Sequence, residues 1–414
     1  MFRHSQLIVA SFFLLSYAPL RAQTAPLESV KAEGSQLPQA TILRLSGMEI
    51  GKPLDKPVIE QACKRLAGTG LFGSVSYKYG PGPKQGYAVT LELTDQPETI
   101  PAVIDIPGVN EDAVWQWLST QYPTLGRKVA ESSQDFIASE IQRHLASALN
   151  GEPVVARPEG DLTTGKILVI FQPRTLPQIG SISFNGVKEF RSEDLAARMQ
   201  KAIGSEGFSE RRFRMFLDGI VRQAYEEHGM YRVEFDRVSL TGTGGGAVGV
   251  ITDIKEGPRF TFGQVQLIGD NLPVAAMLEA AAFPSGGVAN WGDITQRIYK
   301  AEGRLKRTGY LQATSHPKRV LHDDTRVLDV NISYTLGPLY HFGQVSFAGL
   351  SSPLEAKARS IWRMQTGSPY DMAYIGDFVR DLSKAVDLRP YKIKSNDTVR
   401  SGYVVDQVVT FEPK

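Results

Sequence analysis

The chain has 414 residues, a formal net charge of +2 and a single cysteine, Cys63. Its length is too great for one ordinary core and predicts several domains. The balanced charge, without an obvious cluster, argues against a nucleic-acid partner, and one cysteine excludes an internal disulfide and a cysteine-rich metal site. Cys63 lies in an apolar helical pattern, so we interpret it as a core residue.

The N-terminus has the layout of a secretory signal peptide. Arg3 precedes an apolar stretch at 7–15, and Ala22 stands before a polar run, which places the signal peptide at residues 1–22. The stretch is shorter than the about 20 apolar residues that span a membrane, and a buried core helix is the alternative interpretation. We expect a bacterial protein that is exported to the periplasm.

A short pattern recurs at intervals of about 80 residues. Each copy has a glycine, apolar residues two and four positions later, and a second glycine at position six; the copies lie at 180–186, 263–269 and 343–349. This alternation predicts a strand with one buried face, and the closing glycine predicts a turn. The last two copies follow similar Gly-Pro segments, at 257–262 and 337–342.

A second landmark keeps the same spacing. It is a helix end capped by glycine and followed by an apolar strand, at 66–72, 225–231 and 305–311, with a weaker copy at 149–151. Glycine suits the left-handed backbone position that follows a helix C-terminus. Two independent landmarks in one register make chance a poor explanation.

Residues 180–256 show the repeating unit most clearly. The first strand ends at Gly186, Ser192 caps a short helix, and a longer helix presents one apolar face from Phe213 to Tyr225. Two strands follow, joined by the glycine-rich turn 242–246. The order β-α-α-β-β predicts a two-layer α+β sandwich, in which two helices cover one face of three strands.

This unit resembles the POTRA (polypeptide-transport-associated) domain. The resemblance rests on the Gly-Pro-x-Phe-x-Phe-Gly segment at 257–263, the strand ending in Gly269, the helix end at 307–310 and the hairpin after it. It covers about residues 40–414 and implies an α+β fold, an elongated tandem array of about five small two-layer modules.

The resemblance also predicts boundaries for these modules. After the signal peptide and a linker at 23–39, the modules are predicted at 40–97, 98–176, 177–257, 258–337 and 338–414. The second is degenerate in sequence. In the fifth, Leu388–Tyr391 stands where the glycine-aromatic pair is expected, which predicts a distorted final hairpin.

Proteins with strings of such domains usually belong to the outer-membrane barrel-assembly and secretion family, where the string precedes a β-barrel. We expect no barrel here, because no residues remain for its strands after the fifth unit. The resemblance therefore implies a periplasmic protein that binds outer-membrane barrel proteins or assembly components and associates with the outer membrane through a partner. A structural spacer, the soluble half of a split barrel-assembly protein and an exported hydrolase are the alternatives.

An exposed edge strand offers unpaired N–H and C=O groups to which an extended client polypeptide can add. The resemblance places this edge on the strand after the long helix, at 71–79, 231–240 and 311–319. Four side chains would then flank the binding groove: Tyr231, Val233, Phe235 and Tyr310. The alternative is that these side chains belong to the core.

Motifs for catalysis are missing from the sequence. The six histidines show no zinc-ligand spacing, and the sequence has no nucleophile elbow and no phosphate-binding loop. The carboxylate pairs at 226–227 and 323–324 are interpreted as solvated. We therefore expect no enzymatic activity, no cofactor, no metal and no small-molecule substrate.

Overall fold

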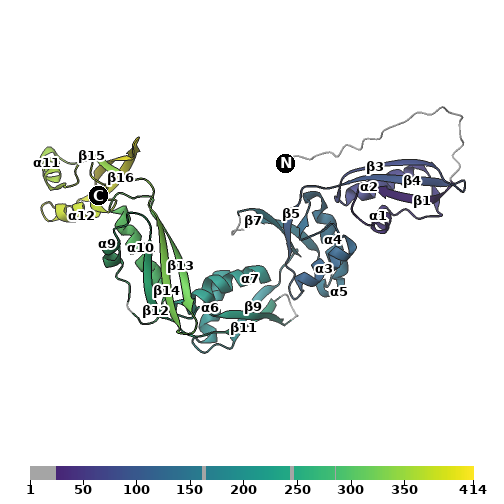
Figure 1. Cartoon of the computed structure of the whole chain (residues 1–414), viewed down its shortest axis with the longest axis horizontal. Coiled ribbons are helices and arrows are strands. Elements are labelled where there is room, and N and C mark those ends of the chain that lie inside the picture. Colours follow the sequence, from purple (N-terminus) through teal and green to yellow (C-terminus); the bar gives the residue numbers. More distant parts are fainter. Residues whose placement is uncertain (1–24, 161–164, 243–246, 285) are drawn as a thin grey trace. The chain divides into compact units, whose positions relative to one another are not determined.

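The computed structural model describes residues 25–414, except 161–164, 243–246 and 285 (Figure 1). The predicted signal peptide, 1–22, lies outside the described residues, as does most of the predicted turn at 242–246. The described chain divides into two compact units. The first two sheets lie in one unit and the last two in the other, and the elements of the third sheet are shared between them.

Five small sheets follow one another along the chain, and we call each sheet with its helices a module, numbered first to fifth. The first module contains β1 (Ala25–Glu33), α1 (Gln39–Ser46), β2 (Pro53–Leu54), α2 (Lys56–Gly68), β3 (Phe72–Pro81) and β4 (Tyr87–Asp95). The second contains β5 (Ile100–Ile104), α3 (Glu111–Gln121), β6 (Lys128–Val129), η1 (Glu131–Ser133), α4 (Gln134–His144), α5 (Ala146–Leu149), β7 (Val154–Gly160) and β8 (Ile167–Pro173).

The remaining modules have the same order of elements without the short strand between the helices. The third contains β9 (Gln178–Asn185), α6 (Ser192–Ile203), α7 (Glu210–Phe216), the π-helix η2 (Leu217–Val221), α8 (Arg222–Glu227), β10 (Glu234–Thr241) and β11 (Ala247–Lys255). The fourth contains β12 (Thr261–Ile268), α9 (Val274–Ala281), α10 (Trp291–Lys306), β13 (Thr314–His322) and β14 (Val327–Thr335). The fifth contains β15 (His341–Ala348), α11 (Ser352–Ile361), α12 (Tyr374–Ser383), β16 (Tyr391–Arg400) and β17 (Val404–Pro413). The predicted tandem α+β fold is thereby confirmed.

The last strand of every module lies in the middle of its sheet. The strand orders are β2-β1-β4-β3, β6-β5-β8-β7, β10-β11-β9, β12-β14-β13 and β15-β17-β16. The central strand supplies alternating core side chains, as in β14, where Leu328, Val330 and Ile332 are fully buried. Helices cover this face. The opposite face is open, except at β8 of the second module, where consecutive residues from Leu168 to Phe171 are all buried.

Two sequence-based predictions are wrong. The predicted linker at 23–39 contains β1. Its Val30, Ala32 and Gly34 match the recurring strand pattern, but Glu28 stands where the first glycine is expected, so the sequence pattern is incomplete there. The final hairpin is regular, because β16 and β17 pair without interruption from Tyr391 to Arg400. The long helix of the third module is present as predicted, with its apolar face buried, and its middle turn, η2, is π-helical.

Glycine closes the first strand because the backbone of the central strand passes directly above it. Gly34, Gly186 and Gly349 have φ values of 83°, 83° and 81°. A Cβ atom at Gly349 would lie 2.1 Å from the carbonyl oxygen of Phe411, so no side chain fits without a backbone shift.

We therefore expect Gly349→Ala to destabilise the fifth module by about 1–3 kcal/mol, through steric conflict and strain at positive φ. Hydrogen exchange of the β15 and β17 amides measures this local free energy of opening. Gly376→Ala is the matched control, because Gly376 lies in α12 of the same module with no atom near the added Cβ. It should stabilise the module by about 0.5–1 kcal/mol, and equal effects of the two variants would contradict the explanation.

Candidate polypeptide-binding edges

In each module, the segment between the helices pairs with the first strand of the sheet. In the first two modules this segment forms a short strand, with Ala25 opposite Leu54 and Ile100 opposite Val129. In the other three it forms a single bridge, between Gln178 and Gly207, Thr261 and Val288, and His341 and Pro369. The start of the first strand is therefore covered by the module's own backbone.

The opposite edge carries no such cover among the described residues. It is formed by the strand after the second helix: β3, β7, β10, β13 or β16. Each of these strands has one neighbour, the central strand, and its other side offers backbone N–H and C=O groups. The strand that the resemblance selects is thus an edge strand in every module.

Two of the four predicted groove residues are buried just before an edge strand. Tyr231 and Val233 precede β10, which begins at Glu234, and their exposed fractions are 8% and 2%. The Tyr231 hydroxyl donates to the carbonyl oxygen of Ala289 at 2.6 Å, and its ring packs in the core of the fourth module. Burial raises the pKa of Tyr231 far above its usual range.

The other two residues are half-buried. Phe235 lies on β10, where the Arg222 guanidinium carbon is 5.0 Å from its ring centroid. Tyr310 precedes β13 and packs against the fourth-module core. The structure therefore does not bring the four predicted side chains together around one groove, and only Phe235 belongs to an edge strand.

The two sequence landmarks meet at the junctions between modules. The carbonyl oxygen of Gly229 accepts a hydrogen bond from Phe260 N at 2.8 Å, and the carbonyl oxygen of Phe260 accepts one from Ala289 N at 3.0 Å. The same arrangement recurs at the next junction. There the carbonyl oxygen of Gly309 accepts from Tyr340 N at 2.8 Å, and the carbonyl oxygen of Tyr340 accepts from Tyr370 N at 2.9 Å. The glycine after the helix and the aromatic residue after Gly-Pro therefore recur together because they bond to each other.

Arg319 strengthens the junction between the third and fourth modules. Its guanidinium donates to both carboxylate oxygens of Glu226, at 2.7 and 2.9 Å, and its central carbon lies 3.8 Å from the ring centroid of Trp291. The Glu226 side chain is 12% exposed, so the prediction that it is solvated is wrong. Asp323 is exposed as predicted but pairs with Arg232 at 2.7 and 2.8 Å.

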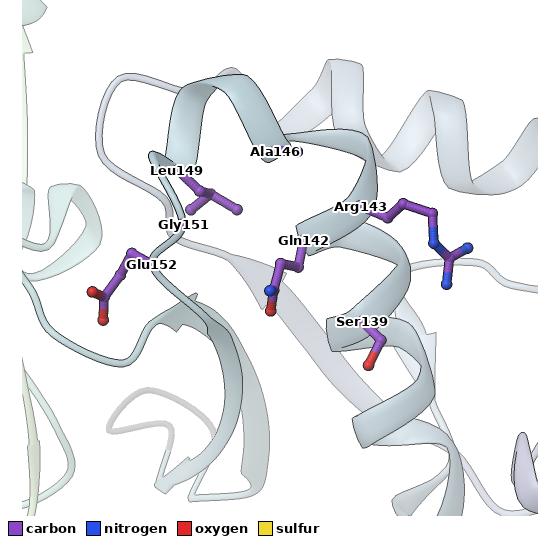
Figure 2. A pocket seen from close by; sticks show the side chains of 7 residues that line it. All are labelled: Ser139, Gln142, Arg143, Ala146, Leu149, Gly151 and Glu152. Carbon is purple, nitrogen blue, oxygen red and sulfur yellow. The ribbon is translucent and has the colours of Figure 1, made fainter.

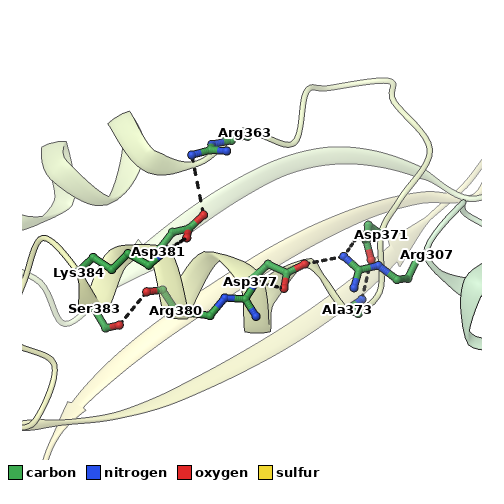
Figure 3. Close-up of polar contacts among 9 residues, drawn as sticks. All are labelled: Arg307, Arg363, Asp371, Ala373, Asp377, Arg380, Asp381, Ser383 and Lys384. Atoms are coloured by element: carbon green, nitrogen blue, oxygen red, sulfur yellow. Dashed lines mark hydrogen bonds and ion pairs between the residues drawn. The ribbon is translucent and has the colours of Figure 1, made fainter. Parts of the chain in front are cut away.

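Ion pairs also join the fourth and fifth modules (Figure 3). Arg307, at the end of α10, lies 2.5 Å from Asp377 and 3.0 Å from Asp371. Hydrogen bonds from Arg307 and Arg380 hold the pKa of Asp377 below its usual range. The stabilisation that the Asp377 ion pairs give is therefore present at neutral pH and is lost as the pH falls through the lowered pKa of Asp377.

A shallow hollow in the second module offers little for a small molecule (Figure 2). Its polar side chains already have partners: Gln142 accepts from Val154 N at 3.2 Å, Glu152 accepts from Thr175 N at 2.8 Å, and Arg143 pairs with Glu140. In the described part of the chain, no three His, Cys, Asp or Glu residues are grouped as metal ligands. The helices described there are all too short or too polar to cross a membrane.

Comparison with solved structures finds POTRA domains. A BamA fragment from Haemophilus influenzae with POTRA domains 3–5 is 18% identical, with a TM-score of 0.36, over 57% of this chain and 96% of that one. BamA from Haemophilus ducreyi lacking POTRA domains 1–3 is 13% identical, with a TM-score of 0.32, over 37% and 30%. POTRA domains 1–3 of the periplasmic domain of Omp85 from Anabaena are 12% identical, with a TM-score of 0.26, over 58% and 97%.

No protein-family model matches the chain. At these identities the similarity concerns the fold alone. The chain consists of POTRA-like repeats, and this statement rests on the order of elements within each module and on the recurring glycine landmarks.

Arg319→Ala should weaken the junction of the third and fourth modules by about 1–3 kcal/mol, because Glu226 is left nearly buried without its partner. Arg319→Lys should not restore it, since an ammonium group cannot form two parallel bonds while stacking on Trp291. Hydrogen exchange at Phe260 and Ala289 measures the effect. Arg389→Ala, which removes an exposed pair with Asp387, is the control and should change nothing there.

Proposed function

We propose that this protein is exported to the periplasm and serves there as a non-enzymatic array of POTRA-like modules that binds other polypeptides. The polypeptides would be outer-membrane proteins under assembly, polypeptides in transport, or components of the assembly machinery. One observation carries the proposal: in every module the strand after the second helix forms a sheet edge without a second neighbour among the described residues.

Backbone pairing suits a binder of unfolded clients. An added strand is held by main-chain hydrogen bonds, which make little demand on sequence, while side chains on alternate residues adjust the affinity. The signal-peptide layout of residues 1–22 supports export. Enzymatic chemistry finds no support in the sequence motifs, and the polar side chains of the shallow hollow beside α4 already have partners within the module or the backbone next to it.

The junctions favour one second candidate, a structural spacer. Backbone hydrogen bonds and the Arg319–Glu226 pair join neighbouring modules, as a component that holds two partners apart requires. Under this alternative the edges would bind nothing. Client binding at β10 therefore separates the two functions.

Proline substitutions in β10 test the proposal. Alternate residues of an edge strand direct their N–H groups outward, so one of the neighbouring variants Arg237→Pro and Val238→Pro removes only an outward donor. We expect the variant with native thermal stability to lose binding of a fluorescent peptide with alternating valine and threonine, measured by anisotropy. Unchanged binding by that folded variant would contradict edge pairing at β10.

Tyr231→Phe tests whether this residue acts in binding or in the junction. Losing the hydroxyl leaves the carbonyl oxygen of Ala289 without its partner, so we expect the variant to be less stable by about 1–2 kcal/mol. Peptide binding should stay at the wild-type level. A loss of peptide binding at unchanged stability would instead indicate that Tyr231 belongs to the binding site.

A further inference from the structure

The five edge strands differ in one respect that controls strand addition. β7 contains Pro158 and β13 contains Pro317, each in the interior of the strand. β3, β10 and β16 have no interior proline, since Pro81 is the last residue of β3 and Pro390 precedes β16. Open edges therefore belong to the first, third and fifth modules, and edges with proline to the second and fourth.

Both prolines lie where they leave their own sheet intact. Pro158 is opposite Val169 and Pro317 is opposite Ile332, and strand pairing continues on both sides of each. Both opposing residues are fully buried. Because a proline inside a strand is tolerated where its missing N–H faces away from the neighbour, the donor is lost from the outer edge.

An added strand would lack one hydrogen-bond donor near the middle of the edge strand with which it pairs. Pro317 is the fourth of nine residues in β13, and Pro158 is the fifth of seven in β7. The longest stretch without proline is four residues in β7 and five in β13, against eight in β10 and ten in β16, so an added strand gains fewer consecutive hydrogen bonds on the edges with proline. The proline ring also occupies the space that the incoming backbone needs, which is how natural edge strands are protected from pairing.

The charged residues on the open edges do not have the same effect. Lys78 of β3 pairs with Glu92, and Lys394 of β16 pairs with Glu412 at 2.7 Å, in each case on the central strand. Lys255 on the central strand β11 likewise pairs with Asp236 of β10 at 2.6 Å. These pairs direct the charges across the sheet, and the outward backbone groups remain accessible.

We propose that client polypeptides add to the first, third and fifth modules and that the second and fourth act as non-binding spacers between them. The inference rests on the proposed function and specifies its binding sites. The ligand is an extended polypeptide with several strand-forming segments. Such a client can occupy more than one edge of the same chain, so that binding at one raises the effective concentration at the next.

Site-specific crosslinking distinguishes the five edges. A photoreactive residue replaces one exposed residue in each edge strand of the full chain: Ser74, Arg157, Arg237, Lys318 or Asn396. The probe is the same valine–threonine peptide. We expect crosslinks from positions 74, 237 and 396, and none above background from 157 and 318.

Removing the proline from β13 and introducing one into β16 gives a matched pair of variants. Pro317→Val restores an outward donor and should raise crosslinking at position 318 about fivefold, the equivalent of one hydrogen bond. Ser395 of β16 occupies the same register position as Pro317 of β13. Pro317 pairs with Ile332, and Ser395 pairs with Val409. On their other side, Ile332 and Val409 each pair with the first-strand residue that lies four positions after the first glycine of the repeat. Ser395→Pro should abolish crosslinking at position 396 while circular dichroism remains native.

Equal crosslinking from all five strands, or no gain in Pro317→Val, would overturn the alternation while leaving polypeptide binding intact. Absence of crosslinks from every strand would overturn both the alternation and the proposed function. If Ser395→Pro fails to fold, the gain in Pro317→Val decides the question alone, since that substitution relieves a constraint.

Discussion

Parallel pairing between the first and last strands determines the rest of the architecture in four of the five modules. It occurs between β1 and β4, β5 and β8, β12 and β14, and β15 and β17. Two parallel strands require a long connection, and here that connection contains both helices and the remaining strand. The last strand therefore inserts between the first strand and the strand after the second helix, and the latter is left at the edge.

The sequence predicts the fold well because both landmarks describe local physics. Alternating apolar residues identify a half-buried strand, and glycine marks positions that no side chain can occupy, as at Gly349. The prediction failed where the local signal was missing. β1 lacks the first glycine of the pattern. β8 is apolar without alternation, since Leu168 through Phe171 are all buried, and the second module therefore looks degenerate in sequence.

The sequence predicts which strand forms the candidate edge, but it does not predict which side chains lie beside that edge. The edge position follows from the order of elements, which the repeat reveals. The surroundings of Tyr231 depend on Ala289, 58 residues further along the chain, and no local pattern indicates that contact. The same limit concealed Glu226: beside Glu227 at a helix end it has the pattern of a solvated residue, yet Arg319 from a distant strand covers it.

One strand illustrates how a repeated element acquires separate tasks. β13 carries both Pro317, which interrupts its outer row of donors, and Arg319, which reaches Glu226 of the preceding module. In the fifth module the residue in the register of Arg319 is Asp397, which accepts a hydrogen bond from Tyr370 of its own module at 2.7 Å. The same position therefore couples two modules in one copy of the repeat and stabilises a single module in another.

Open edges have a mechanical consequence. Hydrogen bonds between strands run perpendicular to the strand direction. Tension along a captured segment would load all of these bonds simultaneously, in shear, whereas tension across it would break them one after another from one end. A polypeptide held at β3, β10 or β16 would thus resist being dragged lengthwise and yet detach readily by peeling, without any unfolding of the module that holds it.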